Sequence, residues 1–477
     1  MRKTYLLLIA LLGTATVNAQ DSLWTLQRSI QYAVDNNLDI KQSVLNERLS
    51  RLQLQQSQLG MLPTASASGN VGRSYGRSID PTTNQFIDAK YYFVGLNGNA
   101  DVLLFGWFQK QNTISQNKFL SKSAAADLDQ LKNDVSLNVA TAFLRILLAR
   151  EQIHISENQV TFSLKQREQT EYFVKAGRSP ELDLAQMQAQ VATDSSNYIT
   201  AVATYQQAVL DMKAIMNFEM ATPFTPVAPE VEKIPLGEMG TLSPEQVYDV
   251  AKDQFGSIRS NQLKIAAAQK GLAAAKGNLY PQLSLGGQLG SNYASSYKEI
   301  TGTGTFNGYN PNGDIVVING APVYVQSPSF TPDVRTIPFW KQLNTNFRQT
   351  VALTLSVPLL NGWSARTAVN RSKIDVQSKQ IGLEQSRVKL KQDVYKAYYD
   401  ARSAVQKFYA TSRADEASDR AYNYAQKRYE LGLMNALELL TTQNNAFKAR
   451  AEALSAKYDL LFKLKVIDYY LGKEIRL

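Results

Sequence analysis

The sequence predicts a mainly α-helical fold that carries a membrane β-barrel portion and is built from two similar halves. Three observations lead to this prediction. The stretch Ala33–Gly72 recurs at Ala251–Gly290, a polar helical run ends in each copy at Pro63 or Pro281, and a strict alternation of apolar and polar residues follows. Alternation with a period of two is typical of a strand with one apolar face. Each half therefore reads helix, strand, strand, long helix, turn, helix.

The repeat also fixes the expected domain organisation. Downstream, Leu103–Trp107 (LLFGW) matches Leu359–Trp363 (LLNGW), and Tyr172–Gln186 resembles Lys427–Thr441. A length of 477 residues would by itself suggest about three domains, but the repeat favours one body made of two halves. We expect a signal peptide, a first repeat, a linker that joins the halves across the outside of the helices, and a second repeat, over residues 1–19, 20–218, 219–243 and 244–477.

The first residues have the pattern of a secretory signal peptide. Arg2 and Lys3 precede a short apolar segment, Leu6–Leu12, and small residues follow up to Ala19, after which we expect cleavage. A membrane anchor would need about 20 apolar residues, so the segment is too short to remain as a span. The chain is therefore expected to leave the cytoplasm.

Composition excludes several classes of protein. The chain has no cysteine and a single histidine, His154, which excludes disulfides, cysteine metal sites and an N-terminal lipid anchor on a thiol. The formal net charge is +10, but lysine and arginine are scattered along helices beside carboxylates. This distribution favours solvated helix faces over a nucleic-acid surface. We expect no metal, no cofactor and no enzymatic activity, because no nucleophile motif or phosphate-binding loop is present.

The sequence predicts four strands, two in each half. We expect strands at about residues 64–73 and 91–105, and at about 282–294 and 347–359. In the third strand Leu283, Leu285 and Leu289 alternate with polar residues, and in the fourth Val351 and Leu353 do the same. The strand that follows Pro63 alternates more weakly. The segments between paired strands, Ser74–Lys90 and about 299–346, are rich in Gly, Pro, Asn and Thr and are expected to be loops.

These strands are long enough to cross an outer membrane, and aromatic residues stand near their ends. A soluble β-sandwich is the alternative. Four strands cannot close a barrel, and lipid does not tolerate an open sheet edge. The membrane interpretation therefore requires that several chains share their strands.

The remaining sequence predicts long helical hairpins. Trp107–Lys175 and Ser364–Glu430 contain almost no turn signal, and at about 1.5 Å per residue each could reach about 100 Å. Return helices over residues 180–218 and 435–471 follow turns at Gly177 and Gly432, which we expect to adopt a positive φ. An ordinary coiled-coil rod explains these helices equally well, but not the strands between them.

The element order, the duplicated helix–proline–strand units and the two glycine turns resemble those of the TolC-type outer-membrane efflux proteins, over nearly the whole mature chain. The resemblance implies a homotrimer with a shared 12-stranded β-barrel in the outer membrane of a Gram-negative bacterium and a long α-helical barrel in the periplasm. It also implies two further partners, a periplasmic adaptor (membrane fusion) protein and an inner-membrane pump of the RND type.

The resemblance carries over to individual residues at the two turns. Asp183 and Tyr429 match residues that hold the family's closed tip, whereas Met434 stands where the family has an arginine. Glu438 matches one acidic ring of the constriction, and Thr441 replaces the other. For Asp183 a second interpretation is a carboxylate that stabilises a helix N-terminus close behind Pro180.

The resemblance also implies a function. The chain would be the exit duct of a tripartite efflux system that passively conducts small molecules expelled by the pump. The outer-membrane channel of a type I protein secretion system is one alternative, and a non-channel periplasmic coiled-coil scaffold is another.

Overall fold

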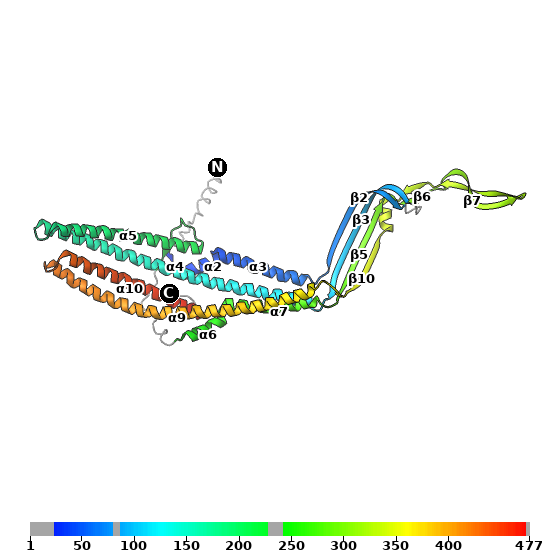
Figure 1. The fold of residues 1–477 in the computed structure, drawn as a ribbon. Helices are drawn as coiled ribbons and strands as arrows, with labels where there is room; N and C mark the ends of the chain where they lie inside the picture. The colour runs from blue at the N-terminus through cyan, green and yellow to red at the C-terminus, as the bar shows by residue number, and fades with distance from the viewer. Residues whose placement is uncertain (1–22, 80–85, 228–241, 474–477) are drawn as a thin grey trace, which may run out of the picture. The chain divides into compact units, whose positions relative to one another are not determined.

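A computed structural model describes residues 23–79, 86–227 and 242–473 of the chain. The expected signal peptide and the middle of the expected linker lie outside these residues. Figure 1 shows the described elements in chain order. The chain divides into two compact units: a helical unit of residues 1–53, 116–269 and 374–477, and a sheet unit of residues 54–115 and 270–373. Each is described by itself below.

The structure repeats with a constant offset. Helices α2 (Leu26–Asn36) and α3 (Leu38–Leu59) recur 218 residues later as α6 (Pro244–Gln254) and α7 (Gly256–Gly277). Helix α4 (Gln109–Lys175) recurs 255 residues later as α9 (Ser364–Glu430). The difference between these offsets means that the second half carries 37 more residues than the first between its two strands. The two halves therefore share one plan and differ by a single large insertion.

Each half begins with two helices where the sequence suggested one continuous run. The break falls at Asn37 in the first half and at Phe255 in the second. Asn37 ends α2, and its side-chain oxygen accepts hydrogen bonds from the backbone amides of Asp39 (2.9 Å) and Ile40 (3.2 Å). One asparagine thus satisfies two of the first backbone amides of α3, so the break between the two helices costs little free energy.

The sheet unit is built on a four-stranded antiparallel sheet in the order β10-β5-β3-β2. These strands span Arg348–Ser356, Gln282–Ala294, Phe86–Phe105 and Thr64–Ile79, and they lie side by side in Figure 1. β5 has the expected bounds, whereas β2 and β3 extend beyond theirs and β10 is shorter. Pro63 and Pro281 each stand immediately before a strand. Strand β1 (Leu23–Trp24) pairs separately with β4 (Thr225–Pro226) in the helical unit.

Two helical hairpins make up most of the helical unit. α4 is followed by α5 (Glu181–Met216) and α9 by α10 (Ala436–Tyr470). The turns have φ of +66° at Gly177 and +71° at Gly432, and an added Cβ at either position would meet no other atom. The need for glycine is therefore one of backbone conformation, and not of space. Among the described residues, no helix contains a stretch apolar enough to cross a bilayer.

The main hydrophobic core of the helical unit surrounds Phe143 in α4, whose side chain is fully buried. It packs with residues from α2, α5, α10 and the chain that follows α5: Leu26, Ala33, Met212, Met216, Phe218, Phe224 and Leu461. Trp24 completes an aromatic cluster with Tyr32, Phe218 and Phe224. This core fastens both chain halves together at the level where the short strands β1 and β4 pair.

The inserted residues of the second half are not the loop that their composition suggested. They form β6 (Lys298–Ile300), β7 (Thr305–Ile318), β8 (Ala321–Thr331), β9 (Val334–Thr336) and α8 (Phe339–Thr345). β7 pairs with β8, and β6 pairs with β9. The expectation of a loop over about 299–346 was therefore wrong, because a turn at Asn319 and Gly320 organises the segment into a hairpin.

Candidate functional site

The four-stranded sheet has one apolar and one polar face. Its register aligns Val102, Leu285 and Leu353 on one face. On the other face it aligns a row of polar side chains across all four strands: Ser66, Asn99, Gln288 and Thr350. A parallel row contains Ser68, Asn97, Gly290 and Arg348. Such a sheet can separate an apolar medium from an aqueous one.

The sheet also has two unpaired edges. In the described part of the chain, β2 pairs with β3 alone and β10 with β5 alone. Leu353, on the β10 edge, is 63% exposed. The outer edges of β2 and β10 thus present backbone groups that have no strand partner among the described residues, and an edge of this kind invites pairing with another chain.

The two helical turns share one backbone geometry. The amides of Arg178 and Leu433 donate to the carbonyls five residues earlier, Phe173 and Arg428, both at 2.8 Å. The glycine amides donate to Val174 and Tyr429, both at 2.9 Å. This pattern is the Schellman motif, in which a positive-φ glycine closes the end of a helix. The sequence prediction of two equivalent glycine turns matches this geometry.

A small apolar cluster lies behind the turns and brings the two hairpins together. Met187 of α5 packs with Tyr429 of α9 and with Leu439 of α10, all of them buried. Met434 is partly buried and packs against the same cluster. Met434 therefore contributes an apolar contact at the turn.

Tyr429 is tied to the other hairpin through its phenol. Its hydroxyl lies 2.9 Å from the Thr170 hydroxyl of α4, and both side chains are buried. Burial raises the pKa of Tyr429; the Thr170 hydrogen bond opposes this shift, and the charge of Asp183 adds to it. The phenol is therefore neutral in the folded protein, and its contribution to stability would be lost only as the pH rises above 10.

Asp183 stands at the start of α5. Ser179 donates a hydrogen bond of 2.6 Å to its carboxylate, and the Asp183 amide donates to Pro180 at 3.1 Å. This is the geometry of a carboxylate in the first turn of a helix, as the second interpretation expected.

Glu438 and Thr441 occupy one exposed face at the start of α10. The Asn435 side chain caps this helix: it accepts from the Glu438 amide at 2.8 Å and donates to the Glu438 carboxylate at 3.1 Å. Thr441 donates to the Leu437 carbonyl at 2.8 Å. The Glu438 carboxylate is thereby oriented while it stays in contact with solvent.

A polar seam separates the two hairpins farther from the turns. A cavity of about 210 Å³ is lined by residues of α4, α9 and α10, among them Gln159, Phe162, Tyr422 and Gln443. Arg450 closes it with an ion pair to Asp419 at 2.5 Å. The hairpins are thus joined by apolar contacts at the turns and by polar groups behind them.

We expect Tyr429→Phe to destabilise this junction by about 1–2 kcal/mol, because it leaves the buried Thr170 hydroxyl without its phenol partner. The double variant Thr170→Val with Tyr429→Phe removes both hydroxyls and should recover part of the loss. Urea unfolding of these two variants and of the parent protein measures the effect. An unchanged midpoint for Tyr429→Phe would show that the bond does not hold the hairpins.

Two helices carry exposed apolar stripes that were not predicted from the sequence. On α3, leucines recur every seven residues at Leu38, Leu45, Leu52 and Leu59, and each is more than half exposed. On α9, Ile374, Ile381 and Val388 repeat with the same spacing and exposure. A seven-residue apolar repeat indicates pairing with another helix. The signal was present in the sequence, but a core within the same chain would have given the same pattern.

A family model described as "Outer membrane efflux protein" matches residues 29–217 and 336–473. "Toxin and drug export protein A" of Aggregatibacter actinomycetemcomitans is 19% identical over 454 residues, covering 94% of this chain and 87% of that protein. The "Solvent efflux pump outer membrane protein SrpC" of Pseudomonas putida is 22% identical over 446 residues, covering 91% and 82%.

The fold has solved counterparts as well. The CmeC outer membrane channel of Campylobacter jejuni matches with a TM-score of 0.75 and 14% identity, over 94% of this chain and 85% of that chain. At this identity the likeness concerns the fold. It confirms the predicted combination of long helical hairpins with a β portion.

Proposed function

Because the chain belongs to the outer membrane efflux protein family, we propose that it is the outer-membrane exit duct of a tripartite efflux system. In this proposal three copies share their strands in a β-barrel of the outer membrane of a Gram-negative bacterium. The helices form a tube in the periplasm, which meets an adaptor protein and an inner-membrane pump, here taken to be of the RND type. The duct conducts small molecules passively.

One observation supports the assembly: each edge strand of the sheet is next in the chain to a helix with an exposed apolar stripe. β2 follows α3, and β10 precedes α9. Both strands are edges of the sheet, and both helices carry exposed apolar stripes. A groove of about 790 Å³ between α7 and α9, lined by Ile265, Ile381 and Val388, offers room for leucine side chains. Pairing α9 and β10 of one copy with α3 and β2 of the next would give both strand edges and both apolar stripes a partner.

The faces of the sheet support its orientation. The apolar face, with Leu285 and Leu353, would meet lipid, and the polar rows, with Asn99 and Gln288, would line the water-filled interior. The helices join the sheet at one end, so the hairpin β7–β8 belongs to the other. With the helices in the periplasm, that other end faces the exterior.

The turns supply the proposed gate. Three copies of Glu438 near the axis would create a negative potential at the constriction, with Thr441 beside it as a neutral lining residue. Opening would move the α9–α10 hairpin outward about Gly432 and release the contacts of Tyr429, Asp183 and Met434.

We expect Glu438→Gln to lower the preference of the channel for cations, because it removes the charge and keeps the hydrogen bond with Asn435. Reversal potentials in a salt gradient across a planar bilayer measure this preference. Asp249→Asn on α6, which neutralises an exposed carboxylate paired with Lys252, is the charge-matched control. Equal reversal potentials for the Glu438 variant and the parent would remove Glu438 from the constriction.

The proposal as a whole is tested by purifying the chain in detergent and measuring its mass and its conductance in a bilayer. A trimer that forms ion-conducting pores is the expected result. A monomer without conductance would contradict the proposal and favour the periplasmic scaffold.

A second candidate is the outer-membrane channel of a protein secretion system, because the name of one relative includes toxin as well as drug export. Deleting the gene separates the two candidates. We expect greater sensitivity to toxic small molecules with an unchanged set of secreted proteins. The loss of a secreted protein without any change in sensitivity would favour secretion.

A further inference from the structure

The insertion of the second half lies mostly outside the part of the chain that matches the family. The matched residues end at 217 and resume at 336, whereas the hairpin spans Thr305–Thr331. Between Glu299 and Asp333 the only charged residue is Asp314. For an exposed hairpin this is an unusually uncharged segment, since exposed strands are ordinarily protected by charged residues.

The tip of the hairpin is apolar on both faces. The register pairs Ile315 with Tyr324, Val316 with Val323 and Val317 with Pro322. Because alternate residues of a strand face opposite sides, face one carries Ile315, Val317, Pro322 and Tyr324, and face two carries Val316, Ile318, Ala321 and Val323. Val317 is 66% exposed and Val316 is 49% exposed. Both faces therefore lack an apolar partner within the described part of the chain.

The edges of the hairpin are less suited to contact than its faces. Asn319 and Gly320 have φ of +53° and +80°, a tight turn across which Ile318 and Ala321 exchange ladder hydrogen bonds. The backbone groups of Val317 and Pro322 therefore point away from the ladder, toward the outer edges of the hairpin. Pro322 has no amide to offer at its edge. Further along, Pro328 and Pro311 lack an amide as well. These prolines interrupt the addition of another strand over a long stretch. Insertion of the hairpin into a bilayer does not fit either, because lipid cannot satisfy the remaining backbone groups of the edges.

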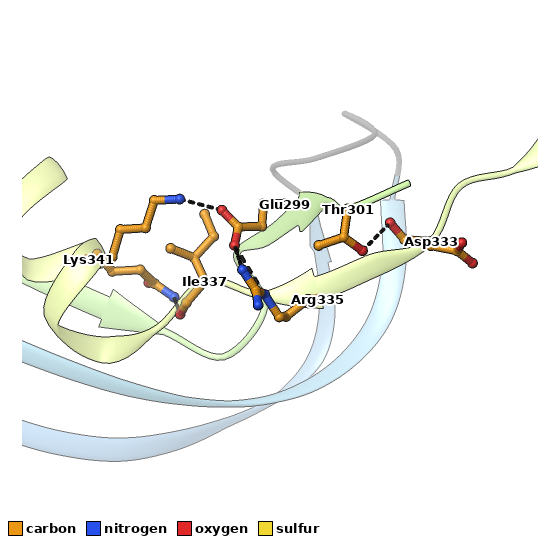
Figure 2. A network of polar contacts seen from close by, with 7 residues as sticks. Glu299, Thr301, Asp333, Arg335, Ile337 and Lys341 are labelled. Atoms are coloured by element: carbon orange, nitrogen blue, oxygen red, sulfur yellow. Dashed lines mark hydrogen bonds and ion pairs between the residues drawn. The ribbon is translucent and has the colours of Figure 1, made fainter. Parts of the chain in front are cut away.

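The base of the hairpin is held by polar contacts among β6, β9 and α8, as Figure 2 shows. Glu299 accepts from Arg335 at 2.7 Å and from Lys341 at 2.5 Å. The Thr301 amide donates to the Asp333 carbonyl at 2.8 Å. The buried Gln342 joins α8 to β5 through two hydrogen bonds with the backbone of Ala294, of 2.9 and 3.0 Å. The hairpin is thus held at its base, which reduces the entropy that an ordered contact at the tip would cost.

We propose that the hairpin tips of neighbouring copies pack against one another, face one of each copy on face two of the next. The inference rests on the proposed trimer. In a cyclic assembly each copy meets its two neighbours with two different surfaces, and this tip has two different apolar faces. The shared sheet would bring three hairpins to the same exterior end, where their local concentration is high. The occupant of each face is therefore a second copy of this chain, and the three tips close a cap at the exterior end.

The natural absence of cysteine allows a direct test. Val316→Cys with Val317→Cys places one thiol on each face, and Ile315→Cys with Val317→Cys places both thiols on face one. Packed sheets lie about 10 Å apart, too far for a disulfide, so the full chain in detergent is treated with a bifunctional maleimide of that length. We expect the opposite-face variant to give a covalent trimer on a denaturing gel, and the same-face variant to give none.

The mass of each untreated sample in detergent separates the outcomes. A trimeric sample of the opposite-face variant that yields no covalent trimer overturns the inference and leaves the proposed function standing. The two apolar faces of the tip would then be expected to contact a different protein and not a second copy of this chain. A covalent trimer from the same-face variant also overturns it, because like faces would then be in contact. A monomeric parent protein removes the proposed function and this inference together.

Discussion

Leu353→Arg is expected to destabilise the membrane-inserted protein by about 2–4 kcal/mol per chain, the cost of a cation at the bilayer midplane. Leu353 lies in the middle of β10, 63% exposed, in register with Leu285 and Val102 on the apolar face. The introduced guanidinium would leave water for lipid. Urea titration of the protein folded into lipid vesicles, followed by the gel mobility of the folded form, measures the change.

Thr354→Arg is the matched control, because it introduces the same side chain one residue farther along, on the opposite face. That face already carries Arg348 in the same strand. If it lines an aqueous interior, this variant should keep nearly the stability of the parent. Equal losses for both variants would show that the two faces meet similar surroundings, as in a soluble sandwich.

The elements that the sequence predicts well are those bounded by strong local signals. β5 has the expected bounds because Pro281 precedes it and its alternation is regular. α9 runs from Ser364 to Glu430 as expected, because the next turn signal is Gly432. In both cases the decisive residues lie within a few positions of the boundary.

Elements that depend on irregular pairing were not predictable in this way. In β7 and β8 the register shifts between Phe306 and Tyr309 and again between Pro311 and Ile315, and the shifts hide the period of two. Gly308 and Gly313 have positive φ in these places, so residues that read as loop are parts of a bulged strand. Asn-Gly is the typical local signal for a hairpin turn, but this segment has three such pairs, at 307–308, 312–313 and 319–320. Only the last of them forms the turn between β7 and β8, so the signal could not place the hairpin.

The candidate site shows a second limit. The turn glycines were found from sequence, but the partner of Tyr429 is Thr170, which lies 259 residues away in the chain. No local pattern marks a contact at that distance. The stripe on α3 was readable as a repeat of leucines. Whether such a stripe faces its own chain or another depends on tertiary structure, which the seven-residue spacing alone does not contain.

Leu45→Glu with Leu52→Glu is expected to abolish the trimer. Both leucines are more than half exposed on α3, and burying each against α9 of a neighbouring copy would contribute about 1.5–3 kcal/mol. The variant loses this contribution at every interface and adds carboxylates that would have to be buried without partners. Light scattering in detergent should show monomers where the parent protein is trimeric.

Asn46→Glu with Gln53→Glu is the matched control for this prediction. It adds the same two charges to the same helix with the same spacing, one position off the stripe, at residues that are also exposed. Because helical neighbours point about 100° apart, these carboxylates can stay in water beside a paired helix. The control should remain trimeric. If both variants are trimeric, α3 does not form the interface, and the strand edges alone must hold the copies together. If both are monomeric, charge on α3 in general opposes assembly, and the stripe has no special role.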